Sequence, residues 1–231
     1  MTILIASGRI RAMALPNLFK KTFPAALILL VTATVAADTT RVIGNFAAGA
    51  LSGWTEKEFS GKTAYRLIRL DGNTVLAASS NASASGLYRK IAVDLTRTPY
   101  LNWSWRVDDI LKGVDETTRG GDDYAARIYV IFSRGWFFWQ THALNYVWSS
   151  NQPPGTFWPN AYTSHAVMVA AQSGEERTGT WVTNKRNVRD DIKRYMGMDV
   201  SDIEAVAIMT DTDNSGQHVT AYYGDIWFSA D

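Results

Sequence analysis

Short runs in which apolar and polar residues alternate dominate the chain, and they restrict its fold more than any other feature. In the run YLNWSWRV the apolar residues all fall on one face, namely Leu101, Trp103, Trp105 and Val107. Such a period of two is typical of a strand with one buried face. Further runs rich in β-branched and aromatic residues, which strands favour, recur from TAYRLIRL to AYYGDIWF. The pattern predicts an all-β protein.

One segment has helical spacing instead. In NVRDDIKRYMG, Val188, Ile192 and Met196 recur at the interval that places side chains on one face of a helix. Asn187 can cap the start of this helix, and Gly197 stands where helices commonly end. Many short strands with one short helix predict an antiparallel β-sandwich, with the helix near residues 187–197.

The first 37 residues have the order of a removable export signal. Four basic residues precede the apolar run FPAALILLVTATVAA, which ends in small residues at Ala37. This run is about 15 residues long, whereas a helix that spans a bilayer needs about 20. We therefore predict a signal peptide over residues 1–37, a single sandwich domain over 38–231, no transmembrane segment after cleavage, and a periplasmic or secreted location. Met1 and Met13 are both compatible with the start of this leader.

Charge and cysteine content exclude several classes of partner and cofactor. Without the leader the chain has 19 basic and 22 acidic residues, a net charge of −3. It therefore has no strong basic field for nucleic acid or anionic lipid. The chain has no cysteine, and its three histidines are scattered outside any metal or triad motif. A small polar ligand or a glycan remains as the expected partner.

Two acidic segments carry the residues best suited to a polar site. In GGDDYAAR, Asp123 and Arg127 point to the same face of one strand. Four residues of strand separate their Cα atoms by about 13 Å, so we expect each to meet a partner on a neighbouring strand. Asp211 is the nearest acidic candidate for Arg127. A buried network and an open cleft are both compatible with this grouping, and the polar RGGD loop favours the cleft.

The segment DTDNSG has two interpretations. Asp211, Asp213 and Ser215 alternate before Gly216, as the oxygens of a calcium loop do. A polar turn over residues 213–216 explains the same composition without a metal. Tyr222 stands where an EF-hand would need glutamate, so only a partial calcium site is compatible with the sequence.

Aromatic residues gather around the long loop at 149–164. Sugars present C–H faces and hydroxyl edges, so a glycan site combines aromatic rings with carboxylate, amide and guanidinium groups. Trp136 and Trp139 belong to the same cluster, and filling of the core is the competing role for any of these tryptophans. The predicted ligand-binding residues are Asp123, Arg127, Trp148, Trp158, Tyr162 and Asp211.

Several motifs resemble known families. The strings WSWRV, GGDDYAARIYVIF, NYVW, RNVRDDIKRYMG, MTDTDNSG and YYGDIWF, in this order, resemble the bacterial domain of unknown function 3047. That resemblance implies export and brings no established activity or catalytic residue. The strings VIGNFAAGALSGW and AYYGDIWF resemble jelly-roll, galactose-binding-like carbohydrate-binding modules. This second resemblance implies a jelly-roll sandwich with a structural calcium at Asp225, although Ala47 and Ala48 replace the acidic residue common in those modules.

These observations support three functional hypotheses. The first is an exported protein that binds a carbohydrate or cell-envelope glycan, with Asp211, Asp213 and Asp225 as candidate calcium ligands. The second is a glycan hydrolase or lyase that uses Asp123 and Asp211 as acid and base. The third is a non-catalytic envelope scaffold.

Overall fold

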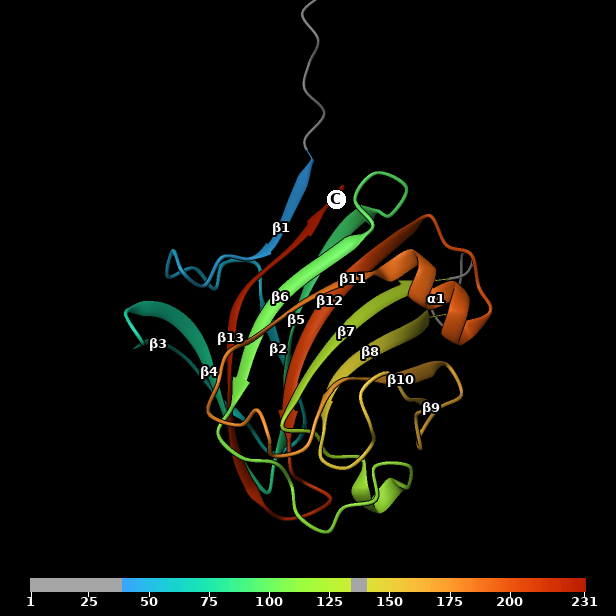
Figure 1. Ribbon diagram of the computed structural model, residues 1–231. Helices are drawn as coiled ribbons and strands as arrows, with labels where there is room; N and C mark the ends of the chain where they lie inside the picture. Colours follow the sequence, from blue (N-terminus) through green and yellow to red (C-terminus); the bar gives the residue numbers. More distant parts are fainter. Residues whose placement is uncertain (1–38, 134–140) are drawn as a thin grey trace, which may run out of the picture. The chain divides into compact units, whose positions relative to one another are not determined.

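The computed structural model describes residues 39–133 and 141–231. The expected leader over residues 1–37 lies outside the described residues, as do Trp136 and Trp139. Within the described ranges the chain forms two β-sheets and one α-helix, and most strand pairs are antiparallel (Figure 1). The predicted all-β sandwich with one short helix is confirmed.

The first sheet, sheet A, has six strands among the described residues. Its main path runs β11-β6-β13-β4-β3, and β1 pairs with β13. The strands are β1 (Thr40–Gly44), β3 (Ala64–Leu70), β4 (Asn73–Asn81), β6 (Tyr100–Val107), β11 (Val182–Asn187) and β13 (His218–Ser229). The last strand therefore lies inside this sheet, between β6 and β4.

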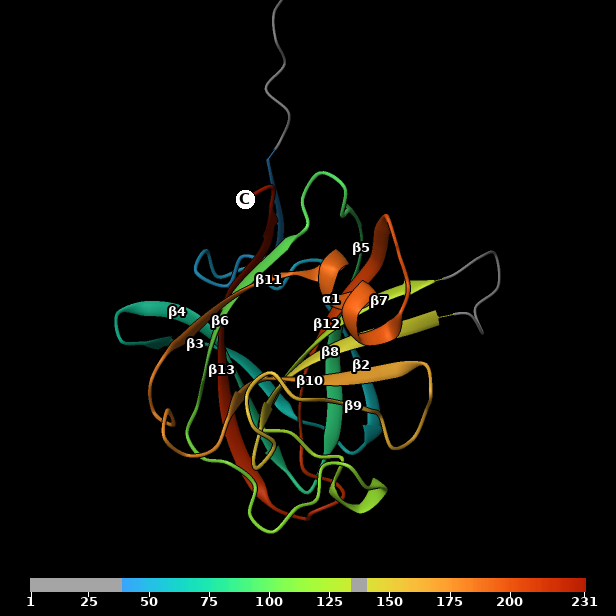
Figure 2. The ribbon, with the colours of Figure 1, turned by 45° about the vertical axis from the view of Figure 1, so that its right-hand side comes forward.

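The second sheet, sheet B, has seven strands in the described part of the chain, in the order β2-β5-β12-β7-β8-β10-β9. They are β2 (Thr55–Ser60), β5 (Ala84–Asp94), β7 (Ala126–Ser133), β8 (Thr141–Ser149), β9 (Phe157–Pro159), β10 (Ala166–Ser173) and β12 (Asp202–Asp211). Figure 2 shows the central strands β12, β7, β8 and β10 lying side by side. The pair β8–β10 is parallel, unlike the neighbouring pairs β7–β8 and β9–β10.

Alternate side chains from both sheets fill the core between them. Leu101, Trp103, Trp105 and Val107 are all fully buried, as the alternation in β6 predicts. The ring of Trp103 lies 5.2 Å from that of Tyr146 on β8, and the rings of Trp105 and Trp148 are 6.1 Å apart. Aromatic pairs thus join the two sheets, and burial of such large rings is a major source of stability in a chain without cysteine.

The local signals for the helix and the first hairpin are also confirmed. Helix α1 (Val188–Met196) begins after Asn187, whose side chain accepts a hydrogen bond from the backbone N–H of Asp190 at 3.2 Å. It ends at Gly197, which has a left-handed φ of 67°. Strands β3 and β4 are joined by Asp71 and Gly72, both with positive φ, as a tight hairpin turn requires.

Three strands were not predicted, because their sequences lack the alternation of apolar and polar residues that indicates a strand. Every residue of β2 is exposed, so its sequence TEKEFS has no apolar face. Strand β9 has three residues and lies inside the segment expected to be a loop. Strand β1 is short and exposed over its first three residues. Among the described residues no helix is long and apolar enough to cross a membrane.

Candidate functional site

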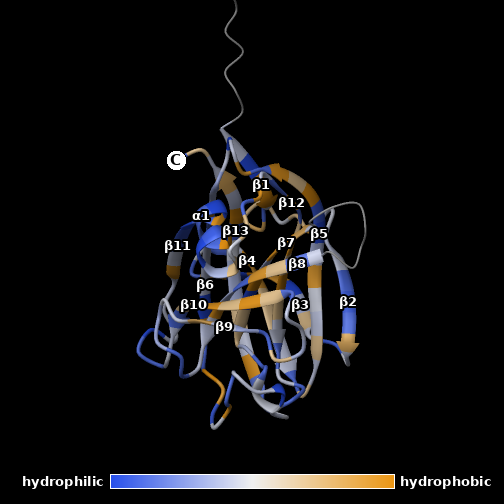
Figure 3. Cartoon of the chain, turned by 90° about the vertical axis from the view of Figure 1, so that its right-hand side faces the viewer, coloured by the Kyte–Doolittle hydropathy of each residue, from blue (hydrophilic) through white to orange (hydrophobic). Residues whose placement is uncertain are grey.

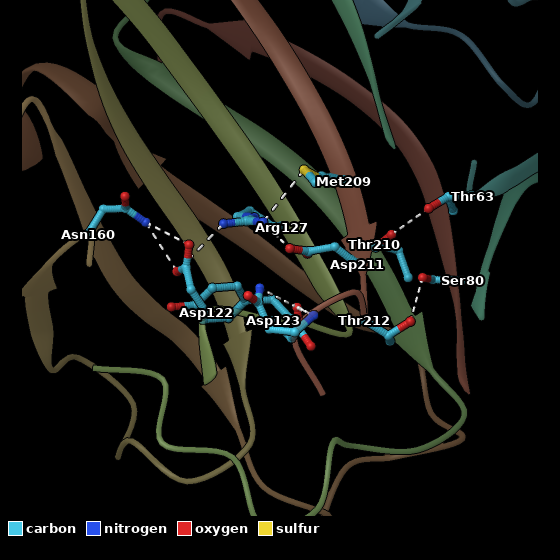
Figure 4. Close-up of polar contacts among 12 residues, drawn as sticks. Thr63, Ser80, Asp122, Asp123, Arg127, Asn160, Met209, Thr210, Asp211 and Thr212 are labelled. Atoms are coloured by element: carbon cyan, nitrogen blue, oxygen red, sulfur yellow. Dashed lines mark hydrogen bonds and ion pairs between the residues drawn. The ribbon is translucent and has the colours of Figure 1, made fainter. Parts of the chain in front are cut away.

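A buried ion pair joins the two acidic segments of the sequence. Strands β7 and β12 are antiparallel neighbours, with Arg127 opposite Met209, so Asp211 lies two residues beyond that position. The Nη2 atom of Arg127 donates to Oδ2 of Asp211 at 2.5 Å (Figure 4). Arg127 is 4% exposed and Asp211 is 2% exposed. The expectation that Arg127 finds Asp211 on a neighbouring strand is therefore confirmed.

Aromatic rings and a second carboxylate complete the surroundings of Arg127. Its guanidinium carbon lies 4.7 Å from the ring centre of Tyr124 and 5.0 Å from that of Tyr129. Asp122 places a carboxylate oxygen 4.0 Å from Nη1 of Arg127, and it also accepts two contacts from the amide of Asn160. Arg127 therefore belongs to a buried network, and it also lines a pocket, so the two alternatives left by the sequence occur together.

Asp123 holds the turn that follows β12. Its carboxylate accepts hydrogen bonds from the backbone N–H of Asn214 at 3.2 Å and of Ser215 at 2.6 Å, and from the side chain of Asn214 at 3.0 Å. Asp123 is fully buried. Gly216 closes the turn with a φ of 68° and a hydrogen bond to the carbonyl of Thr212. The polar-turn interpretation of residues 213–216 thus accounts for most of this segment.

Three carboxylates converge beside this turn. Asp123, Asp211 and Asp213 each bring one oxygen to within 4.8 Å of the other two, a grouping compatible with a metal ion. Asp225 does not belong to this group of described residues. It lies seven residues along β13 from His218, about 23 Å in a strand, and its carboxylate instead accepts from the N–H of Ala47 at 2.9 Å.

The acidic groups of this cluster outnumber its basic groups, and this raises the pKa values of two of them. Burial raises the pKa of Asp211 to about 8, with further increases from Asp123 and Asp122 and an opposing decrease from Arg127. Burial, followed by the charge of Asp123, also raises the pKa of Asp213. One guanidinium therefore faces more carboxylates than it can neutralise.

A pocket of about 460 Å³ opens beside the ion pair, and we call it the Arg127 pocket. Residues that line it include Arg127, Tyr129, Asn145, Asn160, Tyr162 and Asp211. Three buried polar atoms of its lining have no hydrogen-bond partner in the described part of the protein: Nε of Arg127, Oδ1 of Asn145 and Oδ1 of Asp211. Buried polar groups are nearly always paired, so three unpaired atoms in one pocket indicate a place for polar ligand groups or water.

The predicted aromatic residues divide between core and pocket. Trp148 is fully buried and donates from Nε1 to the carbonyl of Gly174 at 3.1 Å. Trp158 is 7% exposed and packs 6.5 Å from the ring of Tyr124. The two tryptophans were predicted to bind the ligand, but β8 and β9 direct their rings into buried clusters. They are therefore packing residues and not platforms for a ligand. Tyr162 is 53% exposed and lines the Arg127 pocket.

Sequence reasoning missed several pocket residues. Asn145 lies on β8 and Tyr129 on β7, where the strand register places them opposite each other. Asn160 and Phe59 also line the pocket. Single amides and isolated aromatic residues carry no spacing signal, so only the pairing of β7 with β8 could have drawn attention to Asn145.

Comparison with known sequences identifies the family. Residues 52–227 match the family described as "Protein of unknown function (DUF3047)". The chain belongs to the DUF3047 family. A search of curated proteins gave no match.

Solved structures resemble this DUF3047 protein at low identity. The family 11 carbohydrate-binding module of the cellulase Lic26A-Cel5E of Clostridium thermocellum is 9% identical, with 84% of this chain and 96% of that chain covered and a TM-score of 0.43. The carbohydrate recognition domain of Emp47p is 12% identical, with coverages of 85% and 97% and a TM-score of 0.44. The xyloglucanase domain of NopAA from Sinorhizobium fredii is 9% identical, with coverages of 75% and 91% and a TM-score of 0.43.

Proposed function

We propose that the protein binds a glycan in the Arg127 pocket. The observation that carries this proposal is the coincidence of unpaired polar atoms and exposed aromatic rings in one pocket. Arg127, Asn145 and Asp211 line this pocket, and each has one buried polar atom without a hydrogen-bond partner among the described residues. Tyr162 and Phe59, whose side chains are exposed, line the same pocket. Sugar hydroxyls both donate and accept, and sugar C–H faces pack on aromatic rings, so one glycan unit suits both features.

The arrangement favours binding over acid–base catalysis. Asp123 and Asp211 approach each other closely enough for a retaining glycosidase, in which the carboxyl groups are about 5 Å apart. However, both oxygens of Asp123 accept hydrogen bonds from the turn, and Asp123 is not among the residues that line the pocket. A catalytic carboxylate must contact the substrate, so Asp123 serves the scaffold of the site instead.

Replacement of Tyr162 by alanine is expected to weaken glycan binding about 2- to 10-fold, the range for loss of one aromatic stacking contact. A glycan array identifies the ligand, and isothermal titration of the purified chain then measures the affinity. Phe157→Ala is the matched control, because Phe157 is 54% exposed but packs on Tyr195 outside the pocket. Equal loss of affinity in both variants, or no glycan bound at all, would contradict the proposal.

We also propose that Asp123, Asp211 and Asp213 hold a divalent cation such as calcium. Hard cations of this kind prefer carboxylate oxygens. The support beyond the acidic grouping is the buried Oδ1 atom of Asp211, which lacks a hydrogen-bond partner among the described residues. A bound cation would also offset the excess negative charge around Arg127.

Calcium is expected to raise the melting temperature by several degrees relative to chelator. A ligand specific to the native state stabilises it by about 2.7 kcal/mol at a hundredfold excess over its Kd. Asp213→Asn should remove this difference, because it deletes a partly buried ligand that does not belong to the core. Asp225→Asn should keep it, since Asp225 holds Ala47 elsewhere. Superimposable melts of the wild type would leave the polar turn as the whole role of this segment.

We further propose that the protein is exported, in keeping with a ligand from the cell envelope. The support is the order of basic, apolar and small residues before Asp38. Cleavage after Ala37 predicts an intact mass that corresponds to a chain beginning at Asp38, and retention of Met1 or Met13 would contradict it.

A further inference from the structure

A second hollow adjoins the Arg127 pocket on the same face of sheet B. It measures about 380 Å³, and its lining includes Lys57, Phe59, Tyr88, Lys90, Tyr129 and Met209. We call it the lysine groove. Phe59, Tyr129 and Met209 line both hollows, so the two lie side by side on the outer face of the sheet, and we call them together the trough.

The strand register explains why the face is hollow here. Tyr88 of β5 pairs with Ala207 of β12, and Ala207 pairs with Tyr129 of β7. Residues opposite each other in a sheet point to the same side, so a small alanine lies between two large rings. The next position toward the Arg127 pocket places Gly86 opposite Met209 and Lys57. Small residues at the centre and aromatic residues at the sides produce a trough with apolar walls.

The charge of the lysine groove is opposite to that of the Arg127 pocket. Lys57 and Lys90 are exposed, and no acidic residue belongs to the lining of the groove. None of the ion pairs found among residues 39–133 and 141–231 involves either lysine. The amine of Lys57 lies 5.1 Å from the ring centre of Phe59. Figure 3 shows that β2, which carries Lys57, is hydrophilic along much of its length.

The two lysines are spaced for separate anionic groups on one extended ligand. Lys57 is opposite Gly86, and Lys90 lies four residues further along β5, so about 13 Å of strand separates their positions. The neighbouring Arg127 pocket contains Asp122, Asp211 and Asp213. A ligand that follows the whole trough therefore needs anionic groups over the lysines and neutral hydroxyls over the aspartates.

This charge pattern distinguishes a glycan from a nucleic acid. A nucleic acid carries a phosphate at every residue, and such a chain would place negative charge over the aspartates. A glycan can carry carboxylate or sulfate groups on some sugar units and only hydroxyls on others. The aromatic walls suit its sugar rings along the full length of the trough.

We infer that the trough selects an acidic glycan, with uronic-acid carboxylates or sulfate esters held by Lys57 and Lys90. This inference rests on the proposed function and adds to it the chemical class of the glycan. The ligand extends from the Arg127 pocket, where its hydroxyls pair with polar side chains of the lining, into the lysine groove, where its anionic groups meet the amines.

An alternative role for Lys57 comes from its place on an edge strand. Strand β2 is the first strand of sheet B, and lysine on an edge strand prevents pairing with other chains. That role does not require Lys90, which lies on the second strand and faces the same groove. Binding measurements with both lysines replaced therefore separate edge protection from recognition.

The test titrates the full chain with oligosaccharide pairs that differ only in charge. One pair is hexagalacturonate and its methyl ester, and the other is a sulfated galactan oligosaccharide and its desulfated form. The acidic member of at least one pair is expected to bind about 5- to 30-fold tighter, as two exposed charge contacts allow. Lys57→Gln with Lys90→Gln should abolish this preference and leave the affinity for the neutral member within about twofold. Lys62→Gln is the matched control, because Lys62 pairs with Glu58 outside the groove.

Each outcome separates this inference from the proposed function. Binding of neutral and acidic glycans with equal affinity, or a preference that survives the double replacement, overturns the inference and leaves glycan binding intact. If the array and both pairs give no binding, the proposed function fails and the inference fails with it. Single-stranded RNA that binds through the two lysines, in place of any glycan, would also overturn the inference.

Discussion

Arg127→Ala is expected to lower the free energy of unfolding by about 3–5 kcal/mol, the cost of leaving a buried charge without its partner. Arg127 is 4% exposed, and its loss would leave the carboxylate of Asp211 buried beside Asp122 and Asp123. It would also leave a void between the rings of Tyr124 and Tyr129. Chemical denaturation of the variant and the wild type measures the difference.

Arg189→Ala provides the matched control for this loss. Arg189 contacts Asp199 through two hydrogen bonds of 2.8 and 3.2 Å, but the side chains are 39% and 57% exposed. Exposed pairs of this kind contribute about 0.2–1 kcal/mol. If Arg127→Ala cost no more than Arg189→Ala, the network around Arg127 would not be structural, and the place of Arg127 in the pocket would be its remaining role.

The alternating pattern of the strands predicted the core well because burial acts on every second residue. Trp103 and Trp105 lie between the sheets, as the alternation in β6 requires. The pairing of Arg127 with Asp211 was also predicted correctly. The placement of Asp123 on the same strand as Arg127 was wrong, because β7 begins at Ala126 and Asp123 lies in the preceding loop.

The division of aromatic residues between core and site could not be predicted in the same way. Trp148 and Tyr162 both lie next to or within the long segment 149–164, yet Trp148 is fully buried and Tyr162 is half exposed. Their environments depend on which strands become neighbours, and the parallel pairing of β8 with β10 has no local signal. For the same reason, no local pattern could indicate that Lys57 and Lys90, 33 positions apart, share a groove.

The loop that carries Asp122 and Asp123 to the site depends on a backbone contact at Gly121. A Cβ atom at Gly121 would lie 2.7 Å from the backbone nitrogen of Asp115 and closer still to its carbonyl group. The segment after Asp115 is held in place, because the carboxylate of Glu116 accepts hydrogen bonds from Ser149 and Ser150. Neither backbone can move aside without displacing the loop.

Gly121→Ala is therefore expected to lower the free energy of unfolding by about 3 kcal/mol, the upper part of the range for overpacking, because the clash is with backbone and not with a flexible side chain. Gly120→Ala is the matched control, since a Cβ atom there has no neighbour within 4 Å and the expected change is within about 0.5 kcal/mol. Chemical denaturation of both variants gives the comparison.

Displacement of the loop also moves Asp122 and Asp123 away from Arg127 and the turn at residues 213–216, so Gly121→Ala should lose glycan affinity while Gly120→Ala retains it. Equal stability of the two variants would show that the loop yields easily, and the positions of both aspartates would then not depend on this contact.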